Sequence, residues 1–331
     1  MQLFEVMLPG LFTTVQDLGR FRCRKFGLPA AGPMDSFSYR VGNILVGNRE
    51  DDAALETTVL GPKLKVLGEA AIAITGGDIG FTINDEPAPM WTVLRVKAGD
   101  VLKSKGPRNG CRAYICVSGG IDVPSVMGSK STHVLYHIGG IEGRALKKGD
   151  IIKIGNFNGN QNVLIGRGIS EEIRTKISGI LPEKKNLATR LRVIMGPSDD
   201  HFPSKSIKTF LNSDYVVTPL VNREAYRLDG PDIKHNSKGP DVMTSDLLPG
   251  TIQIPGGHKP IIFLHDRACG GYAIIAVVIS VDLPRIGHLQ PGDKIQFQKV
   301  TMNEAYALLE DFERSIASFK SSIQVTVHVV F

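Results

Sequence analysis

Short runs of aliphatic and β-branched residues, separated by glycine, proline and aspartate, dominate the pattern of this chain. Such runs predict strands, and they cover residues 64–68, 70–75, 111–117, 150–155, 191–196, 215–220, 251–255, 259–265, 273–281 and 294–300. Short strands with frequent turns are typical of barrels and sandwiches. The pattern therefore predicts a mainly β protein with few, short helices.

One predicted helix follows Asp35, with apolar residues on one face between Phe37 and Leu45 and a stop at Gly47. Asp35 stands where an N-cap belongs, because its carboxylate can accept from first-turn N–H groups. A catalytic role for this carboxylate is the open alternative.

A second helix is predicted after Thr301, where Thr301 and Glu304 fit a capping box. The final segment, residues 321–331, alternates apolar and polar positions and predicts a strand that pairs with a sheet edge.

A Gly-Asp turn leading into a strand recurs within residues 96–104, 146–154 and 289–297. Glycine supplies the positive φ of such a turn. The recurrence indicates related β units, although a favourable hairpin entry alone would also explain it. Residues 156–186 are weakly patterned. We therefore predict a β-barrel-type domain over 1–185 and a second over 186–331, the latter ending in a helix and a strand.

The net charge of the 331-residue chain is +6, but its basic residues are dispersed and aromatic residues are 7%, which argues against nucleic-acid binding. No apolar run reaches membrane-spanning length, and the N-terminus has no signal-peptide pattern. The four cysteines form no CxxC pair, so we expect a reducing, cytoplasmic location.

Polar residues between apolar runs are the candidates for chemistry, because burying them is costly unless they are satisfied or used. In the segment TTVQDLGR, Gln16 and Arg20 are predicted to bind substrate, and Asp17 can orient it or act as a base. A local ion pair that stabilises a turn is the alternative for Asp17 and Arg20.

Further along, Glu56 is predicted to serve acid–base chemistry or to be a buried structural acceptor. Asn43 is expected to be partly buried with hydrogen-bond partners. Gly119 and Gly120 follow a buried strand, where paired glycines either form a turn or let a ligand approach the backbone.

In the second half, Arg223, Tyr226 and Arg227 lie in NREAYRLDG, and Gln253 lies in TIQIP. We predict substrate binding by all of them. An arginine can clamp a carboxylate or phosphate through two parallel hydrogen bonds, although Arg227 could instead pair with Asp229 or Glu224.

Histidines at 258, 265 and 288 lack the spacing of a metal site, so no metal is predicted. Cys269 precedes two glycines and is interpreted as an inert, buried thiol rather than a nucleophile.

Taken together, TTVQDLGR, GPMDSFSYRVGNILVGN, SGGIDVPSVMGSKST, GGIEGRALKKGD and NREAYRLDG resemble the family once called allophanate hydrolase subunit 2. This family, whose members are similar to biotin-dependent carboxyltransferases, includes the C subunit of bacterial 5-oxoprolinase, the antagonist of a sporulation-kinase inhibitor, and half of the carboxyltransferase region of urea carboxylase. The resemblance extends from about Phe4 to Ala307.

The resemblance implies two cyclophilin-like β-barrel units and action in a complex with partner proteins like the B and A subunits of 5-oxoprolinase. Its chemistry is ATP-dependent opening of the lactam of 5-oxoproline to glutamate, where ATP is used by the complex. Arg223 or Arg227 would suit the carboxylate of this small amide substrate, and Asp17 or Glu56 would suit proton transfer.

Two other functions stay open at this point. One is carboxyl transfer to a urea-like amide, although the chain has no Met-Lys-Met site for attached biotin. The other is regulation, by binding a kinase inhibitor. The chain also departs from the family at His265–Tyr272, where HDRACGGY replaces a run ending in Gln-Thr-Thr-Gly-Gly-Tyr, so this loop could take a different ligand.

Overall fold

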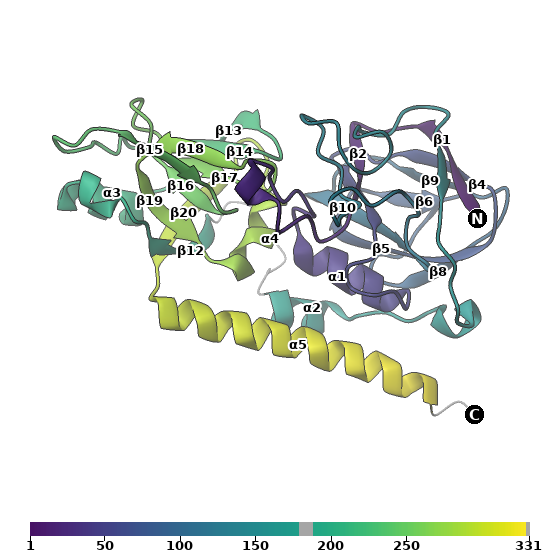
Figure 1. Ribbon diagram of the computed structural model, residues 1–331. Helices are drawn as coiled ribbons and strands as arrows, with labels where there is room; N and C mark the ends of the chain where they lie inside the picture. Colours follow the sequence, from purple (N-terminus) through teal and green to yellow (C-terminus); the bar gives the residue numbers. More distant parts are fainter. Residues whose placement is uncertain (179–187, 329–331) are drawn as a thin grey trace. The chain divides into compact units, whose positions relative to one another are not determined.

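The computed structural model describes residues 1–178 and 188–328 (Figure 1). The chain divides into two compact units. Unit 1 comprises Met1–Arg20, Ala31–Ile180 and Arg314–Phe331, and unit 2 comprises Phe21–Ala30 and Leu181–Glu313. The domain boundary predicted at residues 185/186 lies outside the described residues.

Unit 1 contains a six-stranded sheet and a five-stranded sheet. In spatial order the first consists of β11 (Ile151–Lys153), β1 (Gln2–Leu8), β4 (Lys63–Val66), β9 (Val101–Ser104), β6 (Phe81–Ile83) and β7 (Glu86–Pro87). The second consists of β2 (Phe12–Gln16), β3 (Ala54–Thr58), β10 (Asn109–Val117), β5 (Ala70–Asp78) and β8 (Val93–Val96). All pairings within these two sheets are antiparallel.

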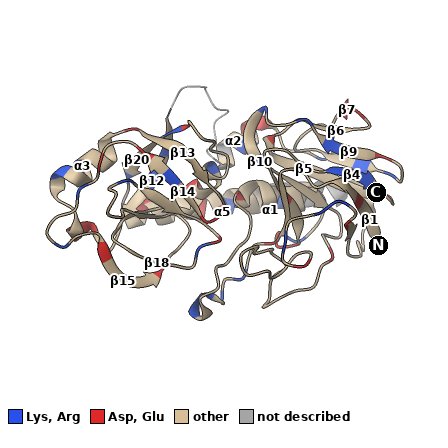
Figure 2. Ribbon diagram, turned by 90° about the horizontal axis from the view of Figure 1, so that it is seen from above, with Lys and Arg blue, Asp and Glu red and all other residues tan. Residues whose placement is uncertain are grey.

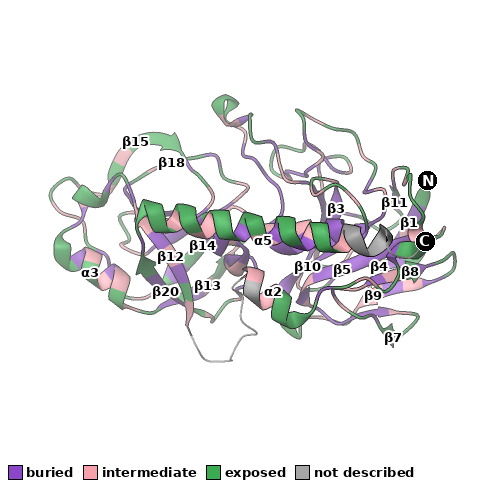
Figure 3. Ribbon diagram, turned by 90° about the horizontal axis from the view of Figure 1, so that it is seen from below, coloured by how far each residue is buried: buried purple, intermediate pink, exposed green. Residues whose placement is uncertain are grey.

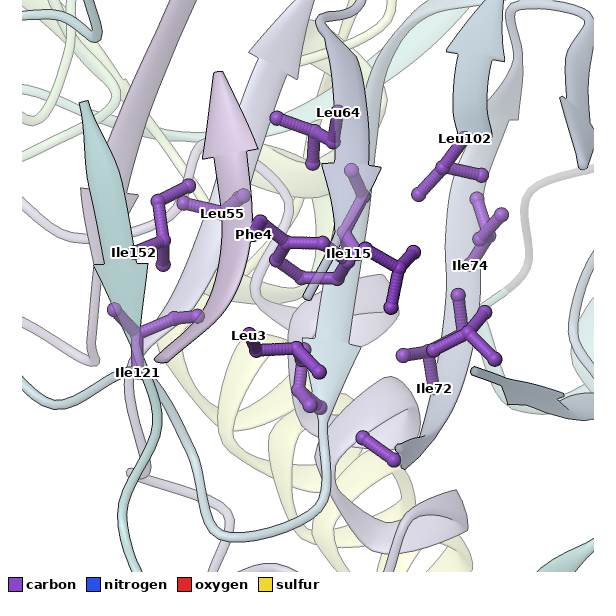
Figure 4. Packing of buried hydrophobic residues seen from close by; sticks show 14 of the residues in the cluster. Leu3, Phe4, Leu55, Leu64, Ile72, Ile74, Leu102, Ile115, Ile121 and Ile152 are labelled. Atoms are coloured by element: carbon purple, nitrogen blue, oxygen red, sulfur yellow. The ribbon is translucent and has the colours of Figure 1, made fainter. Parts of the chain in front are cut away.

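The core of unit 1 is a hydrophobic cluster to which strands of both sheets contribute (Figure 4). Phe4 lies among leucine and isoleucine side chains, including Leu55, Leu64 and Ile115, and all four are fully buried. Alternating strand positions supply these side chains, since successive residues of a strand point to opposite faces.

Unit 2 is built on a closed barrel whose order includes one parallel pair, β12 with β20. Its strands are β12 (Thr189–Met195), β19 (Ile274–Val278), β16 (Thr251–Gln253), β17 (Ile261–Phe263), β14 (Ala225–Asp229), β13 (Tyr215–Val221) and β20 (Lys294–Lys299). A separate two-stranded ribbon pairs β15 (Asp241–Asp246) with β18 (Cys269–Tyr272). Together with the two sheets of unit 1, the barrel confirms the mainly β prediction.

The predicted Gly-Asp turns share one geometry. Gly99, Gly149 and Gly292 all have positive φ, at 96°, 89° and 96°. In each turn the following aspartate accepts a hydrogen bond from the N–H three residues earlier, and each glycine donates to a carbonyl of another strand. Each turn leads into a strand, namely β9, β11 and β20. The device therefore occurs in both units.

The helices are α1 (Ser36–Leu45), α2 (Glu171–Ser178), α3 (Ser204–Asn212), α4 (Leu283–Ile286) and α5 (Met302–His328), with short 3-10 turns at Arg24–Phe26, Gln161–Leu164, Asp199–His201 and Ser280–Asp282. The two predicted helices are confirmed. Gly47 ends the first at φ 74°, and Thr301 and Glu304 form the expected capping box for α5.

Helix α5 corrects two expectations, because it is 27 residues long and it includes residues 321–328 of the segment predicted as a strand. The last three residues of that segment, 329–331, lie outside the described residues. Its buried residues Phe312, Ile316 and Phe319 recur at helical spacing, while Tyr306 is exposed. Figure 3 shows buried and exposed positions alternating along α5. The alternation near the C-terminus does not decide the structure there, because extending an existing helix is far easier than starting a new element.

Close packing of α1 on β5 and β10 depends on a glycine. A Cβ atom at Gly42 would lie 2.6 Å from the Sγ atom of Cys116 and 2.9 Å from the Oγ1 atom of Thr75. Both neighbours are fully buried, so neither has room to move.

We predict that Gly42→Ala destabilises the protein by about 1–3 kcal/mol through overpacking. This is opposite to the gain of about 1 kcal/mol that the same change gives in an unconstrained helix. Denaturant unfolding measures it, and adding Cys116→Ala should recover part of the loss. A Gly42→Ala protein at least as stable as the wild type would contradict this packing.

Candidate functional site

The carboxylate of Asp17 organises the segment 129–131 in unit 1. It accepts hydrogen bonds from the hydroxyls of Ser129 (2.5 Å) and Ser131 (2.7 Å) and from the backbone N–H groups of Gly19 (2.9 Å) and Lys130 (2.5 Å). Arg20 is 2% exposed and donates to the Ser131 carbonyl at 2.5 Å. Asp17 and Arg20 therefore both contact the loop 129–131, and their predicted roles toward a substrate stay predictions.

Gln16 lies beside this loop and links it to the chain returning toward α1. Its amide donates to Thr14 Oγ1 (3.0 Å) and the Thr132 carbonyl (3.2 Å), and its Oε1 atom accepts from the Gly32 N–H (3.1 Å). Gln16 is fully buried, so these contacts take up its hydrogen-bonding groups.

Asp35 and Glu56 are brought together by Tyr114, which sequence reasoning missed. The Tyr114 hydroxyl donates to Glu56 Oε2 at 2.8 Å and accepts from the Asp35 N–H at 2.8 Å. Glu56 Oε2 also accepts from the Met34 N–H at 2.8 Å. Asp35 caps α1 by accepting from Ser38, which confirms its predicted N-cap role. A tyrosine in a buried strand was the available signal, since its hydroxyl needs a partner.

The predicted catalytic roles of Asp17, Asp35 and Glu56 stay predictions. Each carboxylate accepts hydrogen bonds within unit 1, and Asp35 and Glu56 are 0% and 1% exposed. Their observed contacts hold the strand–helix connection and the loop at fixed positions.

Asn43 is fully buried and has the partners that its position demands. Its amide donates to the Asp52 carbonyl (2.8 Å), and its oxygen accepts from Asn48 (2.9 Å). Asn48 in turn accepts from the Gly119 N–H at 2.8 Å, while the Gly120 N–H donates to Val117 at 2.9 Å. Both glycine N–H groups are thus used inside a turn, at φ 90° and 65°.

In unit 2, Arg223 is nearly buried and paired with Asp266. Its guanidinium contacts both carboxylate oxygens, at 3.0 and 3.1 Å. Tyr226 is 1% exposed, and its hydroxyl is 3.5 Å from the Leu289 carbonyl. Gln253 is fully buried and donates to the Tyr272 carbonyl at 2.8 Å, so it anchors β18.

Arg227 differs from these residues, because it is exposed on β14 and lines a cleft of about 360 Å³. The ion pairs suggested for it do not form. Glu224 lies 3.8 Å from Arg267, and Asp229 lies 3.2 Å from Lys259. The two arginines of this motif therefore differ: Arg223 is buried and paired with Asp266, whereas Arg227 is exposed and lines a cleft.

The remaining predictions concern histidines and Cys269. Among residues 1–178 and 188–328, no three His, Cys, Asp or Glu side chains gather as a metal site. The prediction that Cys269 is buried is wrong: it is exposed, because β18 belongs to the ribbon that stands outside the barrel (Figure 3). Basic and acidic segments are interspersed in each unit (Figure 2).

The chain belongs to the carboxyltransferase domain family, subdomain A and B, whose model matches residues 26–299. It is 32% identical to the 5-oxoprolinase C subunit of Escherichia coli over 94% of this chain and 96% of that one. It is 35% identical to urea amidolyase of Lachancea kluyveri over 96% of this chain. The crystal structure of the K. lactis urea amidolyase superposes with a TM-score of 0.88 at 33% identity, covering 96% of this chain and 20% of that one.

The chain spans about a fifth of the length of the urea amidolyases that it matches, at 17–20%. These relatives support an enzyme-related role in an amide-hydrolysing or carboxylating system. In the described part of the chain, no helix is both long and apolar enough to cross a membrane.

We predict that Tyr114→Phe costs about 1–3 kcal/mol of unfolding free energy, because it removes a donor to the buried Glu56 carboxylate and an acceptor for Asp35. Tyr306→Phe is the matched control, since Tyr306 is 59% exposed on α5. Denaturant unfolding of both variants compares them, and equal stabilities would contradict the buried network.

Burial raises the pKa of Tyr39, Tyr114 and Tyr215 above the ordinary value, and nearby carboxylates add to the shift for Tyr39 and Tyr114. Since the folded state keeps these protons longer than the unfolded state, stability should fall as the pH rises above about 10. At about pH 11 the folded protein should show less phenolate absorbance than the denatured protein, because Tyr39, Tyr114 and Tyr215 keep their protons in the folded state. Full ionisation in the folded protein would argue against this burial.

Proposed function

We propose that this chain is a subunit of an ATP-dependent 5-oxoprolinase-type complex that opens the lactam of 5-oxoproline to glutamate. In this reaction water adds to the lactam carbonyl carbon, the ring C–N bond breaks, and ATP hydrolysis drives the opening. The observation that carries the proposal is the similarity to the C subunit of 5-oxoprolinase, which extends over 94% of this chain and 96% of the relative. An exposed arginine at a small cleft suits a substrate with one carboxylate.

We propose further that the complex contains proteins like the B and A subunits of 5-oxoprolinase and that nucleotide binds largely outside this chain. The sequence has no GxxxxGK[ST] phosphate loop. The Gly119 and Gly120 N–H groups, which could face an anion, already donate within unit 1. All four cysteines are free thiols, which fits action in the cytoplasm.

A second candidate is carboxyl transfer to a urea-like amide. The family's carboxyltransferase name and the 35% identity to a urea amidolyase favour it. Because this chain has no Met-Lys-Met site, carboxybiotin would come from another polypeptide. Urea has no carboxylate, so this candidate gives Arg227 no charged group of the substrate to bind.

We predict that this chain, mixed with its cognate A and B subunits, releases glutamate and phosphate from 5-oxoproline and ATP. Omitting this chain should reduce glutamate release to background, because the substrate-binding surface would be incomplete. Urea in place of 5-oxoproline should give no ATP hydrolysis above background.

An assembled complex that releases no glutamate from 5-oxoproline but carboxylates urea when carboxybiotin is supplied would replace this proposal with the carboxyltransferase candidate. Equal glutamate release with and without this chain would remove it from the reaction altogether.

A further inference from the structure

The cleft at Arg227 lies beside an irregular stretch of strand β13. In the pairing of β13 with β14, Val217 lies opposite Leu228, but Val221 lies opposite Tyr226, so β13 has extra residues between these pairs. Pro219 lies in this stretch and cannot donate to a ladder. Thr218 closes the bulge by donating from its hydroxyl to the Arg227 carbonyl at 2.9 Å.

The two cations that line the cleft, Lys259 and Arg227, differ in whether they already have partners in the protein. Lys259 is committed to Asp229 (3.2 Å), Asp232 (3.1 Å) and the Gly230 carbonyl, and hydrogen bonds to the two aspartates raise its pKa. Within residues 1–178 and 188–328, the Arg227 guanidinium has neither a hydrogen bond nor an ion pair. Arg227 is therefore the cation in the cleft that is left to meet a ligand.

The rest of the wall is mainly apolar. Leu220 and Leu228 flank the strand pair, and Pro255, Pro260 and Ile261 come from the segment leading into β17. The volume of about 360 Å³ is at the lower end of small-molecule sites. A compact ligand with one carboxylate and a small ring that presents its CH2 groups to this wall matches this combination of lining and charge.

We propose that this cleft is a carboxylate subsite, in which Arg227 binds the carboxylate of a small cyclic amide while the ring lies against the leucine, proline and isoleucine side chains. This inference rests on the proposed function, because it takes 5-oxoproline as the amide. The proposal gives the two arginines of NREAYRLDG different roles. Arg223 is held by Asp266, and Arg227 is the one that binds substrate.

The test is calorimetric binding to the full chain with L-5-oxoproline, 2-pyrrolidinone and inorganic phosphate as probes. 2-Pyrrolidinone has the same ring without the carboxylate, and phosphate is an anion without the ring. We expect 5-oxoproline to bind about tenfold or more tightly than either of them.

Arg227→Ala should weaken 5-oxoproline binding about tenfold or more, and Arg227→Lys should recover part of it, because lysine keeps the charge but loses the planar fork. Arg190→Ala is the matched control, since Arg190 is also an exposed arginine on a barrel strand and its side chain is outside the cleft. It should bind like the wild type.

Equal 5-oxoproline binding by wild type and Arg227→Ala, no 5-oxoproline binding, or equal binding of 2-pyrrolidinone would overturn the subsite. Phosphate binding as tight as 5-oxoproline binding would overturn it in favour of a phosphate site. The proposed function is judged separately by glutamate release from the complex. If the complex turns over 5-oxoproline and Arg227→Ala has the same KM as the wild type, the subsite is wrong and the proposed function stands. If the chain binds 5-oxoproline but the assembled complex releases no glutamate, the proposed function is wrong.

Discussion

The need to satisfy buried charged and polar groups shapes most of this structure. A buried carboxylate, guanidinium or amide costs free energy unless it is hydrogen-bonded or paired. Asp17 accepts from two serine hydroxyls, Glu56 shares Tyr114 with the backbone of Asp35, and Arg223 meets Asp266. These contacts fix loops that are far apart in sequence. They also show why an exposed arginine without a partner in the described chain, Arg227, is notable.

Backbone devices position these side chains. The recurring Gly-Asp turns tie strand entries to neighbouring strands in both units, so they set the ends of β9, β11 and β20. The bulge in β13 does the opposite, because it breaks the ladder with β14. The Gly-Asp turns thus fix strand entries, while the irregular pairing of β13 with β14 lies beside the cleft.

Much of the scaffold was predictable from local patterns. The apolar runs such as 70–75 and 111–117 became β5 and β10, and the N-cap at Asp35 and the box at Thr301 and Glu304 formed as expected. Local reasoning failed at residues 321–328, where an extended helix overrides the alternation, and at Cys269, where the ribbon leaves a thiol exposed. Burial of a short strand depends on what covers it, and sequence periodicity does not contain that information.

The candidate site was predictable as a set of residues but not as an arrangement. Both arginines were candidates because they lie in the motif NREAYRLDG. The motif did not predict that Arg223 pairs with Asp266, which is 43 residues away. Tyr114 was hidden in an apolar run, although it joins Asp35 to Glu56. Long-range contacts of this kind arise from the topology. The sequence alone therefore did not indicate that Arg223 is paired and Arg227 exposed.

A crystal structure of this chain with 5-oxoproline bound would test the role of Arg227 most directly. We expect the ligand carboxylate at roughly 2.7–3 Å from the Arg227 guanidinium, with the ring against the apolar wall of the barrel cleft. A ligand seated in another part of the protein, with the cleft empty, would contradict this role.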